Sequence, residues 1–138
     1  MGITMQAQVV VGGASQGELL VASEPLSFWG GYDYHTGTVI DQRHPLANQV
    51  AAGRILALPF TRGSSSTTSV LLEAVKAGTA PAAIVTTESD TFFTLASVVA
   101  DEMYGTPIPL FVLDEAQFAQ FEDGRAINID AQGTIKFL

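Results

Sequence analysis

Three consecutive stretches, RILALPF (54–60), TRGSSSTTS (61–69) and VLLEAVKAG (70–78), decide the fold of this chain. An apolar run, a turn rich in glycine and serine, and a second apolar run predict a strand, a loop and a helix. Serine and threonine hydroxyls can accept hydrogen bonds from the free N–H groups at the start of a helix, and glycine tolerates the left-handed conformation that ends one. We therefore expect a helix that begins within the Ser/Thr run and ends at Gly78.

Short apolar runs bounded by turn residues predict further elements on both sides of this unit. We expect strands at residues 6–11, 18–22, 81–86, 107–113, 126–129 and 134–137, and helices at residues 91–104 and 115–121. Ser89 or Asp90 would cap the first of these helices and Asp114 the second, while Gly105 would end the first. The middle of the chain reads βαβαβ, which favours parallel pairing, whereas both ends favour antiparallel pairing. The predicted fold is a mixed β/β/α, sandwich-like domain of the α/β class.

Composition and charge limit the class of protein. Residues 1–138 suit a single domain, because 47% of them are hydrophobic and only 14% are charged. A formal net charge of −8 would repel a phosphate backbone, which excludes nucleic acid as a partner. The chain has no apolar run of about 18 residues and its start lacks the basic flank of a signal peptide, so we expect no membrane association and a cytoplasmic location. Without cysteine it cannot supply thiolates to an iron–sulfur cluster, and we expect no metal on this chain.

The serine-rich turn is the candidate functional feature. A helix start of this kind collects N–H donors and positive dipole, and Arg62 adds a charge, so the expected ligand is an anion. The hydroxyls could instead serve only as helix caps, although one cap is enough and six of the seven residues 64–70 carry a hydroxyl. A phosphate-binding P-loop is excluded because no Gly-Lys-Ser/Thr follows. A serine-hydrolase elbow is excluded because both histidines, His35 and His44, precede the serine.

Five segments, in chain order, resemble the small subunit of the aconitase X family, and together they span most of the chain. They are LSFWGG (26–31), IDQRHPL (40–46), GRIL (53–56), RGSS (62–65) and LEAVKAGTAPAAI (72–84). The resemblance implies the fold of the swivelling fourth domain of aconitase, in a protein that pairs with a large subunit or is fused to one. It also implies a hydro-lyase, of which phosphomevalonate dehydratase and cis-3-hydroxy-L-proline dehydratase are known kinds.

The resemblance assigns roles to individual residues of the turn. In aconitase-like enzymes the first serine after the glycine is the proton acceptor, and Ser64 matches it; Gly63, Ser65 and Ser66 would contact the substrate beside it. Aconitase itself has an arginine where this chain has Ser66, so the role of that arginine cannot be transferred, and Arg62 could bind the substrate carboxylate instead. The iron or iron–sulfur cluster is expected on the large subunit.

Two loops offer further candidates. Arg43 or His44 could contact substrate or partner, although a local structural role for the loop is favoured over that. The other loop is aromatic and rich in glycine and includes Trp29, Gly30 and Gly31. For Phe28 and Trp29 a place in the core or at a subunit interface is favoured over contact with a ligand.

Two other functional classes remain open at this point. A phosphohistidine carrier domain has a comparable core, but the corresponding residues 86–92 contain no histidine. A non-catalytic interaction module would use the aromatic loop for docking. Among dehydratase substrates, the low lysine content resembles that of mesophilic bacterial proteins, which favours hydroxyproline or a related small hydroxy acid over phosphomevalonate.

Overall fold

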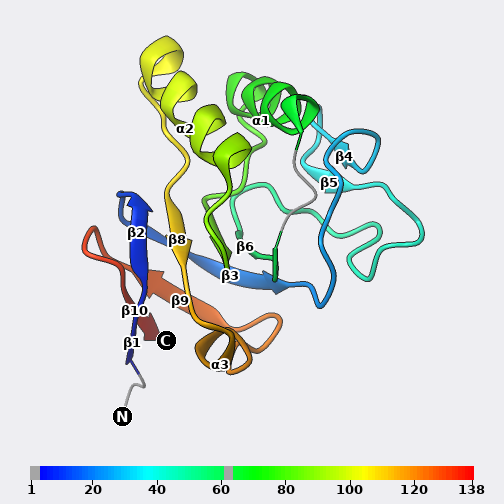
Figure 1. Ribbon diagram of the computed structural model, residues 1–138. Helices are drawn as coiled ribbons and strands as arrows, with labels where there is room; N and C mark the ends of the chain where they lie inside the picture. Colours follow the sequence, from blue (N-terminus) through cyan, green and yellow to red (C-terminus); the bar gives the residue numbers. More distant parts are fainter. Residues whose placement is uncertain (1–3, 61–63) are drawn as a thin grey trace.

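The computed structural model describes residues 4–60 and 64–138, and Figure 1 shows the arrangement of their helices and strands. In chain order the elements are β1 (Thr4–Gln6), β2 (Gln8–Val11), β3 (Ser15–Val21), β4 (Tyr32–Asp33), β5 (Thr38–Val39), β6 (Ile55–Ala57), α1 (Ser65–Ala77), β7 (Ala83–Thr86), α2 (Thr91–Tyr104), β8 (Leu110–Val112), α3 (Glu115–Phe118), β9 (Ala126–Ile129) and β10 (Thr134–Phe137).

Eight of the strands form one mixed sheet in the order β1-β10-β9-β3-β6-β7-β8-β2. The strands β6, β7 and β8 pair in parallel and the outer pairs are antiparallel, as the sequence predicts. The strand β3 also pairs in parallel with β6, which the sequence does not predict. The two edge strands, β1 and β2, are separated in the chain only by Ala7. The sheet therefore curls until its edges approach each other and forms a nearly closed barrel.

The prediction of one continuous strand at residues 6–11 is wrong. The chain changes partner at Ala7: Gln6 pairs with Thr134 of β10, whereas Gln8 pairs with Val112 of β8. Ala7 is buried and donates its N–H to the Gly133 carbonyl at 2.9 Å, so it forms the corner between the two edges. A corner of this kind depends on partners more than 100 residues away, and local sequence pattern does not reveal it.

Alternating side chains of the parallel strands enter two separate cores. Leu19, Ile55, Val85 and Phe111 face the barrel interior, where they meet Ile127, Ile129 and Ile135 of the antiparallel half. Leu20, Leu56 and Ile84 face the other way and pack beneath Leu71 of α1 and Phe93 of α2. The layers are thus antiparallel strands, parallel strands and helices, which confirms the predicted β/β/α arrangement.

The two long helices lie next to each other on one side of the sheet (Figure 1). The helix α1 ends at Gly78, whose φ of 76° is left-handed, and α2 is capped by Asp90 and ends at Gly105, as predicted. The predicted helix at residues 115–121 is shorter, because α3 ends at Phe118. Turns follow that bring Phe121 into the barrel core against Phe118 and Phe137.

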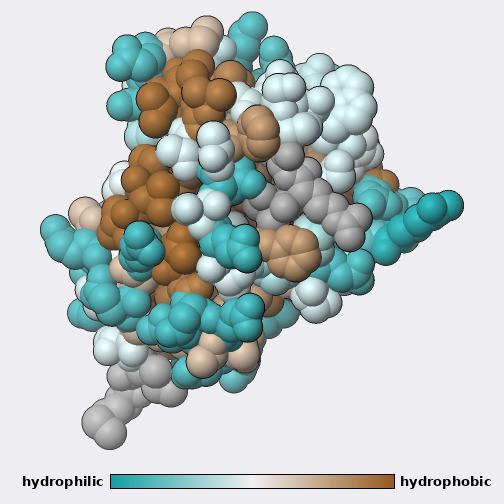
Figure 2. All heavy atoms as spheres, viewed as in Figure 1, coloured by the Kyte–Doolittle hydropathy of each residue, from teal (hydrophilic) through white to brown (hydrophobic). Residues whose placement is uncertain are grey.

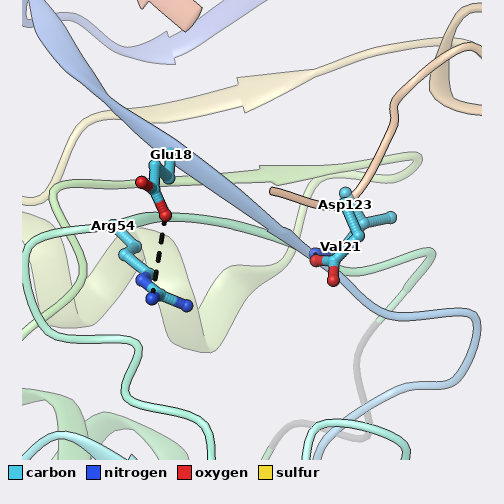
Figure 3. Close-up of polar contacts among 4 residues, drawn as sticks. All are labelled: Glu18, Val21, Arg54 and Asp123. Atoms are coloured by element: carbon cyan, nitrogen blue, oxygen red, sulfur yellow. Dashed lines mark hydrogen bonds and ion pairs between the residues drawn. The ribbon is translucent and has the colours of Figure 1, made fainter. Parts of the chain in front are cut away.

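The middle and the carboxyl end of β3 are held by contacts with neighbouring segments (Figure 3). Glu18 forms an ion pair with Arg54 at 3.7 Å, and Val21 donates its N–H to the Asp123 carboxylate at 2.9 Å. Because β3 joins the parallel half of the sheet to the antiparallel half, these contacts connect it to a segment in each half, Arg54 before β6 and Asp123 before β9.

Candidate active site

The candidate site lies at the edge of the sheet where the parallel strands end. The helix α1 begins beyond the carboxyl end of β6, and α2 begins beyond the carboxyl end of β7. The Thr68 hydroxyl, in the first turn of α1, donates to the Phe92 carbonyl in the first turn of α2 at 3.0 Å, which holds the two helix starts together. In open α/β sheets this edge is the usual place for ligands, because helix N-termini converge on it.

Ser64 is the N-cap residue of α1. Its backbone is extended, with φ −148° and ψ 177°, and its hydroxyl accepts the N–H of Ser66 at 3.3 Å. The Thr67 hydroxyl in turn accepts the N–H of Ser64 at 3.4 Å, which completes a capping box. The Ser64 residue is exposed, so its oxygen combines a backbone donor, the positive end of a helix and an open surface.

The other hydroxyls of the run divide into two groups. Thr67 and Thr68 are buried and serve the packing of the helix start, while the Ser69 hydroxyl donates to the Ser65 carbonyl at 3.3 Å. Ser65 is exposed and Ser66 is half-buried beside Ser64. Arg62 and Gly63 lie outside the described residues. The structure therefore leaves Ser64 and Ser65 exposed and Ser66 half-buried at the start of α1.

The position of Ser64 has a chemical consequence. A serine hydroxyl is a weak base at neutral pH, and it needs stabilisation of its oxyanion before it can accept a proton from carbon. The Ser66 N–H and the dipole of α1 both stabilise negative charge on that oxygen. A neighbouring cation in a closed site would add to this effect.

His44 and Arg43 occupy different environments in the loop before β6. The His44 ring is 7% exposed; its Nδ1 accepts the Leu46 N–H at 3.1 Å, and its Nε2 faces the Glu24 carbonyl at 3.4 Å. The Asp41 carboxylate accepts the Arg43 N–H at 3.0 Å, while the Arg43 side chain is exposed. These contacts give His44 and Asp41 a structural role in the loop, whereas Arg43 is exposed.

The aromatic loop places its two bulky side chains on opposite sides. Phe28 is fully buried and packs against Tyr32 and Phe93, with ring centroids 5.2 and 5.5 Å away, whereas Trp29 is 71% exposed. Gly31 is buried so closely that a Cβ would lie 2.2 Å from the Ser27 carbonyl oxygen. Gly30, with φ 76°, lets the chain turn back so that Trp29 projects outward.

The phenol of Tyr32 anchors this loop from below. It donates to the Thr79 carbonyl at 2.8 Å, and burial raises its pKa above the ordinary value of a tyrosine. The phenol therefore stays protonated and remains a donor. The exposed Trp29 thus projects from a loop whose neighbouring residues, Phe28 and Tyr32, are held in the core.

Sequence reasoning missed a hollow at this edge of the sheet, next to the last residues of β6 and β7. It has a volume of about 330 Å³ and is lined by Ser23, Pro59, Phe60, Thr87, Glu88, Glu115, Phe118 and Ala119. Four separate segments contribute to it, so only the strand order brings these residues together. The one available signal is that Ser23, Thr87 and Glu88 directly follow predicted strands.

The described residues offer no metal site of their own. Within residues 4–60 and 64–138, no three His, Asp or Glu side chains are placed to hold a metal ion, and the whole sequence lacks cysteine. The residues present therefore do not fit an iron–sulfur cluster. In the same part of the chain, no helix combines the length and hydrophobicity that a bilayer crossing needs.

Comparison with known proteins assigns the family. The model of the aconitase X swivel domain matches residues 4–137. The chain belongs to the aconitase X swivel domain family. Among solved structures, this swivel domain is similar to aconitase X of Thermococcus kodakaraensis, crystallised in its holo-form, with a TM-score of 0.86 and 30% identity over 99% of this chain and 98% of that one.

Two curated relatives of this swivel domain differ in their own length. The cis-3-hydroxy-L-proline dehydratase of Pseudomonas aeruginosa is 42% identical over 86% of this chain, which covers 22% of that protein. The phosphomevalonate dehydratase small subunit of Methanothermobacter thermautotrophicus is 34% identical over 96% of this chain and 98% of its own length. The chain thus spans about a fifth of the first relative and nearly all of the second.

Proposed function

We propose that this swivel domain is the small subunit of an aconitase X-type hydro-lyase, and that Ser64 is the base that removes a proton from a small anionic hydroxy acid. The observation that carries the proposal is the exposed N-cap hydroxyl of Ser64 at the start of α1. The turn that carries it is the segment for which the family resemblance implies a proton acceptor.

The proposed step involves one proton and one electron pair on the substrate. The Ser64 oxygen takes the proton from the carbon next to the carboxylate, and the electron pair of that C–H bond forms the double bond as hydroxide leaves the adjacent carbon. On this chain, Ser64 holds the proton, and Ser65 and Ser66 help to position the substrate. Closure of the domain over a partner would exclude water from the turn and strengthen the stabilising field of α1.

We assign the remaining groups of the site to a large subunit. This chain does not supply the thiolates for an iron–sulfur cluster, so an iron or iron–sulfur centre would belong to that subunit, where it would supply a Lewis acid. The P. aeruginosa relative supports such a partner, because four-fifths of its length lies outside the matched domain. A cytoplasmic complex of the two chains is the form in which we expect activity.

Reconstitution with a large subunit tests this function. We expect the complex to dehydrate cis-3-hydroxy-L-proline, and the isolated chain to bind no stoichiometric iron and to turn over neither this substrate nor phosphomevalonate. Phosphomevalonate is the second candidate, favoured by the full-length match to a separate small subunit. Product formation from each compound and the metal content of each chain decide the question. Activity of the isolated chain would overturn the proposed partnership.

Arg62 is predicted to hold the carboxylate of the substrate, although it lies outside the described residues. A guanidinium binds a carboxylate through two parallel N–H donors, and lysine offers only a point charge. Arg62→Lys should therefore raise KM in the complex by about tenfold or more, with a smaller change in kcat. Arg125→Lys is the matched control, because that residue is exposed in the turn before β9 and is not a candidate for the site. Equal KM values for wild type and Arg62→Lys would remove Arg62 from the site.

A further inference from the structure

The hollow beside the strand ends continues into a second one across α3. The second hollow, of about 430 Å³, is lined among others by Val21, Leu46 and Phe121, and it shares Ser23, Phe118 and Ala119 with the first. We call this continuous depression the α3 groove. Apolar side chains form much of its floor, and Phe60 at its rim is 44% exposed, so the groove offers apolar surface that the domain itself leaves uncovered.

The rim of the α3 groove is acidic. Glu88 and Glu115 line the first hollow and Asp123 lines the second, and among residues 4–60 and 64–138 no Lys or Arg lines either one. Asp123 already accepts the Val21 N–H, whereas Glu88 and Glu115 are exposed. The one ion pair found within residues 4–60 and 64–138 joins Glu18 and Arg54, away from this rim. A partner surface that complements the α3 groove would therefore carry an apolar side chain flanked by basic side chains.

A second apolar surface competes for the role of interface. Figure 2 shows apolar side chains gathered over α2 and the neighbouring edge of the sheet. Leu95 and Val98 of α2, which are 48% and 50% exposed, line a hollow there together with Val10. Nothing in the described residues indicates what would cover it. Both surfaces reach the carboxyl edge, because the hollow on α2 includes residues at the start of that helix. The α3 groove differs because it carries two exposed glutamates, Glu88 and Glu115, beside its apolar side chains, and these carboxylates indicate the charge of a partner segment.

We propose that the α3 groove docks a segment of the large subunit that carries an apolar side chain flanked by lysine or arginine. This inference rests on the proposed function, because it takes the large subunit as the partner. Docking in the groove would hold the partner beside β6 and β7 while the Ser64 turn faces the substrate. The apolar floor would supply affinity, and Glu88 and Glu115 would steer and orient the basic segment.

Charge reversal tests the acidic rim. We expect Glu88→Lys combined with Glu115→Lys to weaken the binding of the cognate large subunit at least about tenfold, measured by calorimetry without substrate. The matched control combines Glu73→Lys and Glu102→Lys, two exposed carboxylates on α1 and α2. Each reversal adds two charges, so both double variants carry −4 instead of −8. The control should change the Kd by less than about threefold, because the net charge alone acts weakly at physiological salt.

Substitution of exposed apolar residues tests whether the large subunit binds the α3 groove or the apolar surface of α2. Phe60→Ser should weaken binding by about tenfold, and Leu95→Ser, which removes a comparably exposed side chain from α2, should leave the Kd unchanged. The reverse result would place the interface on α2 and overturn the proposal. Loss of a homodimer, with unchanged affinity for the large subunit, would assign the groove to a second copy and overturn it as well.

The same titrations separate this proposal from the proposed function. Wild-type chain that fails to bind the large subunit would overturn both. Binding that is lost in the groove variants, in a complex that dehydrates neither substrate, would support the groove and overturn the dehydratase function alone. Binding that both groove variants leave unchanged would overturn the groove alone.

Discussion

Replacing Ser64 by alanine in the assembled complex should lower kcat by about 10²–10⁴-fold, the range that a positioned acid–base group contributes. The hydroxyl oxygen is the only polar atom of the Ser64 side chain, and the methyl group of alanine cannot accept a proton. The substrate should still bind, because the backbone donors of the α1 start remain, so KM should change far less than kcat. Steady-state rates of the reconstituted complex give both constants.

The structure also predicts that Ser64→Ala lowers the folding stability of the chain. From the sequence alone, neighbouring hydroxyls are expected to take over the cap, but the cap position is set by the extended backbone of Ser64 and its bond from the Ser66 N–H. Ser64→Ala should therefore also cost roughly 0.5–2 kcal/mol of folding free energy, a shift of a few degrees in Tm.

Glycine separates catalysis from capping at this position. Ser64→Gly should lose only a few tenths of a kcal/mol, because glycine is itself a good N-cap residue. It should nevertheless lose as much kcat as Ser64→Ala. Ser66→Ala, in the same turn, should retain most of the turnover. If the complex with Ser64→Gly works at the wild-type rate, Ser64 is not the base, and the reading of the chain as a non-catalytic interaction module gains support.

Those parts of the fold that depend on local signals could be predicted from the sequence. The Ser/Thr run and Gly78 define α1, and Asp90 and Gly105 define α2, because caps act on backbone groups within one turn. The partner change at Ala7 could not be predicted, since it depends on β10 and β8 at the far end of the chain. The end of α3 depends in the same way on the burial of Phe121.

The residues of the candidate site likewise fall into those that local sequence predicts and those that depend on distant parts of the chain. Local pattern predicted a helix start within the Ser/Thr run, and the family resemblance then singled out Ser64 within that run. Glu88 and Glu115 could not be joined to Phe60, because only the order β6-β7-β8 brings the three strand ends together. Phe28 and Trp29 show the limit most clearly: pattern marks both as apolar, and only the backbone turn decides that one is buried and the other exposed.

Trp29→Ala should weaken binding of the large subunit by about 2 kcal/mol, or about 30-fold in Kd, with little loss of folding stability. The indole is 71% exposed, so its removal leaves no cavity in this domain. Its support is rigid, because the neighbouring Phe28 is fully buried and Tyr32 is hydrogen-bonded to Thr79. A large aromatic side chain held in a fixed position loses little conformational entropy on binding, which makes it a strong anchor.

Phe28→Ala is the matched control and should show the opposite pattern. Truncation of a buried phenylalanine costs about 3–5 kcal/mol of stability, so this variant should melt early whether or not the partner is present. Thermal unfolding of both isolated variants and titration of each with the large subunit separate the two roles. A Trp29→Ala variant that binds the large subunit as wild type does, yet shows a raised KM in the complex, would move Trp29 from the subunit interface to the substrate. In that case the loop at residues 26–31 would close over the ligand, and assembly would depend on the groove along α3.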